Sequence, residues 1–121
     1  MPFKVILSEL VDSTPGASGA ILTDWEGESV VCYCHSCEDE YELKLLGAHT
    51  GILLGRIKDV QKRWCSGEVL EAVITTECQH FIVGSVGVDY SLILALKRDS
   101  LRDRAQYRFR RSVKLLWKEI Y

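Results

Sequence analysis

Proline is almost absent from this chain of 121 residues, which contains only Pro2 and Pro15. A proline-rich linker is therefore excluded, and the sequence predicts a single domain over residues 1–121. Apolar runs of about 20 residues, long enough to span a bilayer, are also missing. The first four residues do not have the layout of a signal peptide, and the five cysteines are an odd number. These features predict reduced thiols and a cytoplasmic protein.

A large excess of charge of one sign is missing as well, since the net charge is only −2. The distribution is uneven: residues 1–96 contain 6 basic and 14 acidic side chains, whereas residues 97–121 contain 9 basic and 3 acidic ones. The acidic isoelectric point of about 5.9 argues against nucleic acid as a partner, because phosphate binding requires a positive potential. We expect the basic segment to be either a solvated helix face or a partner surface formed by Arg104, Arg108 and Arg111.

Motifs of common catalytic sites are missing too. The sequence has no GxxxxGK[ST] phosphate loop, no GxSxG nucleophile turn and no HExxH metal motif. His35, His49 and His80 show no paired spacing, so we expect histidines that pack or form hydrogen bonds rather than act as bases. The sequence therefore predicts a protein that is not an enzyme and that needs no cofactor.

The residues that come nearest to a metal or redox site lie within six positions of one another: Cys32, Cys34, His35 and Cys37. The last three include a CxxC ahead of a predicted helix, where a helix N-terminus lowers thiol pKa values. Thioredoxin-like folds have a proline opposite the CxxC, and no proline follows Pro15. Structural zinc usually joins two separated ligand pairs, and Cys65 and Cys78 do not form a second CxxC. We therefore expect no bound metal, with a cysteine-based redox or metal sensor as an alternative function.

Hydrophobic periodicity predicts an α+β domain with the element order α-β-β-α-β-β-β-α. Helices are expected at residues 2–13, 38–64 and 100–120, and strands at residues 17–23, 28–34, 68–76, 79–86 and 91–97. Gly27 ends the loop between the first two strands, which indicates a hairpin with a positive φ. The last strand is apolar on both faces and is therefore expected at the centre of the sheet. The closing helix has one apolar side, made of Leu101, Ala105, Phe109, Val113, Leu116 and Ile120.

The middle helix is apolar on more than one side, which indicates burial on more than one side. One stripe consists of Leu46, Leu53, Ile57, Val60 and Trp64 and is expected to cover the sheet. A second stripe consists of Tyr41, Leu45, Ala48 and Ile52. Between them, Gly47, Gly51 and Gly55 form a ridge, and each glycine costs a helix about 1 kcal/mol relative to alanine. Close approach of another element would compensate, either within the same chain or, as we expect, from a second copy across a two-fold axis.

Two segments resemble known sequences. Residues 15–27, PGASGAILTDWEG, resemble the opening hairpin of roadblock/dynein-light-chain domains, and residues 89–96, DYSLILAL, are similar to the last strand of that family. The resemblance extends over almost the whole chain in the order of its elements. It implies a roadblock/profilin-like fold, with a five-stranded antiparallel sheet flanked by helices. It also implies a homodimer that pairs through the middle helix and the third strand.

The same resemblance implies a function. MglB-like prokaryotic members of the family bind a Ras-like small GTPase and change its nucleotide cycle, whereas light-chain relatives are adaptors. We therefore expect a homodimeric regulator or scaffold of a small GTPase, with an adaptor that leaves nucleotide turnover unchanged as the alternative. The residues expected at the dimer interface are Gly47, Gly51, Ile52, Leu54, Gly55, Val69, Glu71 and Val73.

Overall fold

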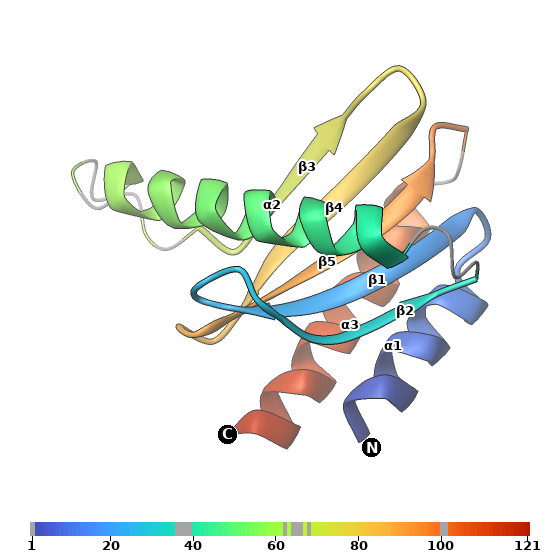
Figure 1. The fold of residues 1–121 in the computed structure, drawn as a ribbon, viewed down its shortest axis with the longest axis horizontal. Helices are drawn as coiled ribbons and strands as arrows, with labels where there is room; N and C mark the ends of the chain where they lie inside the picture. Colours follow the sequence, from blue (N-terminus) through green and yellow to red (C-terminus); the bar gives the residue numbers. More distant parts are fainter. Residues whose placement is uncertain (1, 36–39, 62, 64–66, 68, 100–101) are drawn as a thin grey trace.

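The structure is a computed structural model that describes residues 2–35, 40–61, 63, 67, 69–99 and 102–121. The described residues form three helices and five strands in the predicted order (Figure 1). The helices are α1 (Pro2–Ser13), α2 (Glu40–Gln61) and α3 (Arg102–Ile120), and the strands are β1 (Ala17–Asp24), β2 (Ser29–Cys34), β3 (Glu71–Thr75), β4 (Gln79–Val86) and β5 (Tyr90–Lys97).

The predicted ends of most elements agree with the structure to within one or two residues. The largest differences are in β3, which begins three residues later than the predicted start at position 68, and in α2, which ends three residues before the predicted end at position 64. Residues 38–39, 62, 64, 68 and 100–101 of the predicted elements lie outside the described residues.

The strands form one antiparallel sheet in the order β2-β1-β5-β4-β3. Short turns join β1 to β2, β3 to β4, and β4 to β5. The predicted central position of β5 is confirmed, because β5 pairs with β1 on one side and β4 on the other. The sheet ends at β2 on one edge and at β3 on the other. Gly27 in the β1–β2 turn has a φ of 83°, as predicted for this hairpin.

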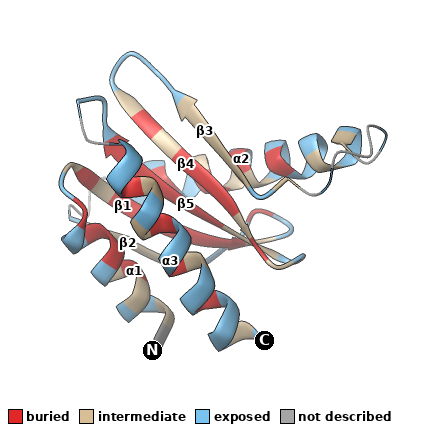
Figure 2. Ribbon diagram, turned by 180° about the vertical axis from the view of Figure 1, so that it is seen from behind, coloured by how far each residue is buried: buried red, intermediate tan, exposed pale blue. Residues whose placement is uncertain are grey.

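Helices cover the two faces of the sheet unequally. α1 and α3 lie side by side on one face, with α1 over β1 and β2 and α3 over β4 (Figure 2). α2 crosses the opposite face, where it packs mainly on β1 and β2 (Figure 1). The face covered by α2 is therefore less completely covered by helix than the face covered by α1 and α3.

The core consists of two clusters, one on each side of the sheet, because side chains alternate along a strand. Leu92, Leu94 and Leu96 of β5 point toward α1 and α3, whereas Ile93 and Ala95 point toward α2. All five are buried, which explains why this strand is apolar on both faces. The predicted apolar side of α3 is also confirmed in the described residues: Ala105, Phe109 and Leu116 are buried, and Val113 and Ile120 are partly buried.

Candidate partner-binding surface

α2 contacts the sheet through a row of small and medium-sized side chains. Its buried residues are Leu43, Gly47, Thr50 and Leu54, which recur at helical spacing. Gly47 allows the closest approach, because a Cβ at this position would lie 2.9 Å from Cγ2 of Thr23 and 3.2 Å from Cδ1 of Ile21. The helix therefore lies directly against β1 at the point where it has no side chain.

The sequence predicted the wrong side of α2 for this contact. Leu53 and Val60, from the stripe expected to cover the sheet, are 47% and 57% exposed, and Ile57 is also exposed. Leu46 is partly buried, and Trp64 lies outside the described residues. The side of α2 that contains Gly47 packs on the sheet, because the missing side chain lets the helix backbone come close to β1. Close packing therefore outweighs the greater hydrophobicity of the predicted stripe.

Two residues expected at the dimer interface are buried inside the chain. Leu54 is 2% exposed, and Gly47 lies on the side of α2 that faces the sheet, against β1. For Gly47 the intramolecular alternative is therefore correct. Gly51 would bring a Cβ only into ordinary contact with Thr23, and a Cβ at Gly55 would meet nothing within 4 Å. The glycine ridge is thus divided, with one end in the core and the other at the surface.

This division leads to opposite expectations for two glycines one turn apart. Gly47→Ala is expected to destabilise the fold by about 1–3 kcal/mol, because its methyl group overpacks the contact with Thr23 and Ile21. Gly51→Ala is expected to stabilise it by up to about 1 kcal/mol through helix propensity, since its nearest neighbour would be 3.5 Å away. Urea unfolding followed by circular dichroism measures both, with Gly55→Ala as a control that should also stabilise. Equal effects at the two positions would contradict the placement of α2.

The outer side of α2 presents an apolar surface to solvent. We call this surface the α2 apolar face, and it consists of Tyr41, Leu45, Ile52, Leu53, Ile57 and Val60. Ile52 is 48% exposed, and all six side chains are large and accessible on one helix. Large exposed apolar side chains gathered on one element of a soluble protein favour a protein contact.

A groove lies between α2 and the neighbouring part of the sheet. It has a volume of about 430 Å³, and Leu45, Leu46 and His49 line its helix side, while Phe81 and Ala95 line its floor. The floor belongs to β4 and β5, next to the strands on which α2 packs most. Beyond it, Val69 and Ile74 on the same face are only partly buried. The α2 apolar face, the groove and this part of the sheet therefore adjoin one another.

β3 is an edge strand, and the predicted interface residues in β3 and just before it point in two directions. Val69 packs with the cluster on the α2 side, whereas Val73 packs with the cluster on the α1 and α3 side. The Glu71 carboxylate accepts hydrogen bonds from Gln106 at 2.9 Å and from Nη2 of Arg110 at 3.0 Å. Glu71 therefore anchors α3 to the edge strand, a contact between residues 39 positions apart that the sequence analysis did not anticipate.

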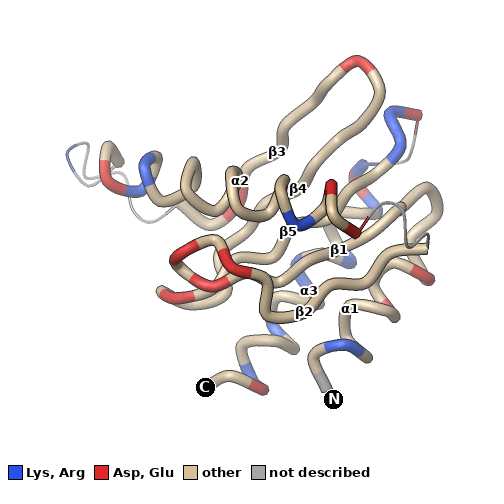
Figure 3. The backbone as a smooth tube through the Cα atoms, viewed as in Figure 1, with Lys and Arg blue, Asp and Glu red and all other residues tan. Residues whose placement is uncertain are grey.

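The predicted basic surface lies on the face of the molecule opposite α2. Arg104 and Arg111 are exposed and Arg108 is half-buried on α3. Figure 3 shows that Lys and Arg residues recur along this helix. Arg108 and Arg111 line a shallow groove between α3 and α1, together with Glu9 and Asp12. The structure thus brings the three arginines onto one face, as the helical spacing predicted, but beside two carboxylates of α1.

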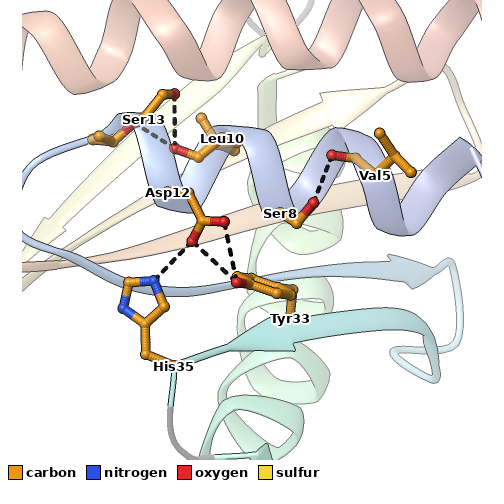
Figure 4. Close-up of polar contacts among 8 residues, drawn as sticks. Val5, Ser8, Leu10, Asp12, Ser13, Tyr33 and His35 are labelled. Atoms are coloured by element: carbon orange, nitrogen blue, oxygen red, sulfur yellow. Dashed lines mark hydrogen bonds and ion pairs between the residues drawn. The ribbon is translucent and has the colours of Figure 1, made fainter.

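The cysteine and histidine cluster is divided by the sheet. Cys32 and Cys34 pack on the α2 side, while Tyr33 and His35 point toward α1. The Tyr33 hydroxyl donates to the Asp12 carboxylate at 3.0 Å, and Nε2 of His35 lies 3.0 Å from the same oxygen (Figure 4). Cys37 lies outside the described residues. Within the described part of the chain, no group of three or more metal-ligating side chains is present.

The contacts at Asp12 predict a specific pH dependence. The hydrogen bonds from His35 and Tyr33 lower the pKa of Asp12 below its ordinary value of 3.8. A carboxyl group with a lowered folded-state pKa stabilises the fold above the unfolded pKa, and this contribution is lost as the pH falls through the folded pKa. Asp12→Asn should therefore be less stable than the wild type at neutral pH, and the difference should shrink below about pH 4. Thermal unfolding across this range measures it, with Glu9→Gln on the same helix as the control; a constant difference at all pH values would contradict this role.

The remaining histidines behave as expected of packing residues. His80 is buried, and its Nε2 atom lies 3.0 Å from the Arg98 carbonyl oxygen while Nδ1 lies 2.9 Å from Oγ1 of Thr75. These bonds join the β3–β4 hairpin to the end of β5. His49 lines the groove beside α2. Among the described helices, none is long and apolar enough to cross a membrane.

Comparisons with known proteins identify the fold. No protein-family model and no curated protein matches the sequence. A roadblock/LC7 domain from Streptomyces avermitilis is 17% identical, with a TM-score of 0.85 over 97% of this chain and 96% of that one. The gliding protein MglB from Thermus thermophilus is 18% identical, with a TM-score of 0.85 over 97% and 87% of the two chains. MglB from Myxococcus xanthus is 13% identical, with a TM-score of 0.87 over 98% and 87%. This chain therefore has the fold of the roadblock/LC7 domains and MglB.

Proposed function

We propose that this chain is a cytoplasmic homodimer that binds a Ras-like small GTPase and regulates or scaffolds it. The observation that carries the dimer is the α2 apolar face beside an incompletely covered part of the sheet. The small GTPase is implied by the resemblance to MglB-like domains, and the shared fold supports it.

The unequal cover of the two sheet faces supports pairing through α2. Two helices pack on one face, whereas α2 alone packs on the other and leaves Leu45, Ile52 and Leu53 exposed. A second copy related by a two-fold axis would place its own α2 over the groove and bury both apolar faces together. β3 lies at the edge of the sheet on the same side as the groove, so its free edge could pair with its counterpart.

The regulator would act without a catalytic site of its own. The sequence contains no GxxxxGK[ST] nucleotide-binding loop, and the described residues contain no group of three or more side chains that could hold a metal ion. A protein of this kind can change a GTPase only by binding one of its conformations better than another. Arg104, Arg108 and Arg111 supply a basic surface on the face opposite α2, which suits an acidic patch on the partner.

The decisive experiment is GTP hydrolysis by the small GTPase encoded nearest to this chain, with and without this protein in excess. Faster hydrolysis supports a regulator, and binding without a change in turnover supports the adaptor instead. Reversing Arg104, Arg108 and Arg111 to glutamate should weaken binding at least tenfold. The control Lys97→Glu/Arg102→Glu, on the same basic segment but away from this face, should leave binding nearly unchanged. No binding to any nearby small GTPase would contradict the proposal.

A further inference from the structure

The outer side of α3 carries large aromatic side chains that the core does not use. The helix packs on the sheet through its other side, where Phe109 and Leu116 are buried. On the outer side, Tyr107 is 71%, Trp117 is 49% and Tyr121 is 59% exposed. Exposed basic side chains recur between these rings at helical spacing. We call this row the α3 outer stripe, and it consists of Tyr107, Arg111, Lys114, Trp117, Lys118 and Tyr121.

The two rings at the end of the stripe are held in place by the fold. The ring centroids of Trp117 and Tyr121 are 4.7 Å apart, and the ring planes are inclined by 39°. The backbone N–H of Tyr121 donates to the Trp117 carbonyl oxygen at 2.9 Å. The Tyr121 ring also lies against Gly87 of the β4–β5 turn, where a side chain would collide with it. Next to Gly87, Val88 is 86% exposed, so α3 and this turn together present apolar side chains at one end of the molecule.

The charge along α3 is mostly of one sign. The helix contains seven basic and two acidic side chains. Arg110 forms an ion pair with Glu71. Lys114 and Lys118 are exposed, and within the described part of the chain neither forms an ion pair. Asp89, beside the exposed valine of the β4–β5 turn, adds one negative charge. The stripe therefore presents uncompensated positive charge between exposed aromatic rings.

This combination of side chains matches the surface of an anionic lipid bilayer. Tryptophan and tyrosine prefer the boundary between water and hydrocarbon, because each has an apolar ring and a polar group. Lysine and arginine are attracted to anionic headgroups. An acidic patch on a protein would attract the lysines but would not require exposed rings between them. A bilayer accommodates both kinds of side chain at the same depth.

We propose that the α3 outer stripe docks this protein on an anionic lipid bilayer. The helix stays packed on the sheet, the rings of Trp117 and Tyr121 enter the headgroup layer, and Lys114 and Lys118 contact anionic headgroups. α2 lies on the opposite face of the sheet, so pairing through α2 leaves the stripe uncovered (Figure 2). This docking does not require the small GTPase.

The test is sedimentation of the full chain with sucrose-loaded vesicles of phosphatidylcholine, either alone or with about 30% phosphatidylserine. The wild type should bind the mixed vesicles, and should bind pure phosphatidylcholine about tenfold more weakly or less. Added salt should weaken binding, because it screens the lysines from the headgroups. Trp117→Ala and Lys114→Glu/Lys118→Glu should each weaken binding to the mixed vesicles by about tenfold or more.

Two control variants match these substitutions. Trp25→Ala removes another exposed tryptophan, which is 67% exposed in the β1–β2 turn. Lys97→Glu/Arg102→Glu makes the same change in net charge at exposed positions outside the stripe. Both should bind the mixed vesicles nearly like the wild type. Circular dichroism of each variant verifies folding.

The fluorescence of Trp117 provides a second readout. The chain has three tryptophans, so Trp25→Phe/Trp64→Phe leaves Trp117 alone. Its emission should shift to shorter wavelength on mixed vesicles and stay unchanged on pure phosphatidylcholine. No binding to the mixed vesicles, or unchanged binding by Trp117→Ala or by the double lysine variant, would overturn the proposal. If the double lysine variant loses binding of the small GTPase while no form of the chain binds vesicles, the stripe is a protein contact and the bilayer is excluded.

Discussion

Replacement of Phe109 by alanine is expected to lower the free energy of unfolding by about 3–5 kcal/mol. Phe109 is 1% exposed and is among the largest fully buried side chains in the described residues. Its ring lies directly on Gly84 of β4, where a Cβ would be only 2.6 Å from Cε1 of Phe109. Removal of the ring leaves a cavity between α3 and the sheet that neither element can close. Urea unfolding followed by circular dichroism measures the loss.

Gly84 provides the matched test of this contact. Gly84→Ala alone should cost about 1–3 kcal/mol, because the added methyl group displaces the Phe109 ring. In the presence of Phe109→Ala that cost should largely disappear, since the space for the methyl group then exists. A double-mutant cycle measures this coupling. Additive effects of the two substitutions would show that the ring and the glycine do not meet, and would contradict the packing of α3 on β4.

Replacement of Ile52 by aspartate is expected to convert the proposed dimer into a monomer. Ile52 lies in the α2 apolar face and is 48% exposed in the single chain, so the substitution leaves the core intact. In the dimer its carboxylate would be buried without a partner. The loss of a central interface residue costs about 2 kcal/mol or more, which weakens association at least about 30-fold. Analytical ultracentrifugation over a range of concentrations measures the shift from dimer to monomer mass.

Val88→Asp is the control for this experiment. Val88 is 86% exposed in the β4–β5 turn and lies outside the α2 apolar face, so its substitution should leave the sedimentation unchanged. A wild-type chain that sediments as a monomer at every concentration would contradict the dimer. If the Ile52→Asp variant keeps the dimer mass, the chain is a dimer but does not pair through α2.

Much of the fold follows from local patterns. The two-sided apolar run of β5 predicts a strand at the centre of the sheet, and this is confirmed. The spacing of Ala105, Phe109 and Leu116 correctly predicts the buried side of α3, because that helix has only one apolar side. Gly27 at the end of the loop between β1 and β2 correctly predicts a hairpin with a positive φ, because this signal also depends only on neighbouring residues.

The candidate surface could be predicted only in part. α2 is apolar on more than one side, so its periodicity does not decide which side meets the sheet. The close contact of Gly47 with Thr23 decides it, and this contact depends on two segments far apart in the sequence. As a result, Leu54 and Gly47 were wrongly expected at the surface, while Ile52 and Gly55 are exposed there and remain predicted interface residues.

The sequence by itself thus determined the order of the elements, the central position of β5 and the apolar side of α3. Each of these depends on the pattern of residues within one element. Only the tertiary structure decided the buried side of α2 and the ion pair of Glu71 with Arg110. The physical reason is the same in each case. Close packing and hydrogen bonding select among alternatives that have similar local patterns, and the selecting partner lies on another element of the fold.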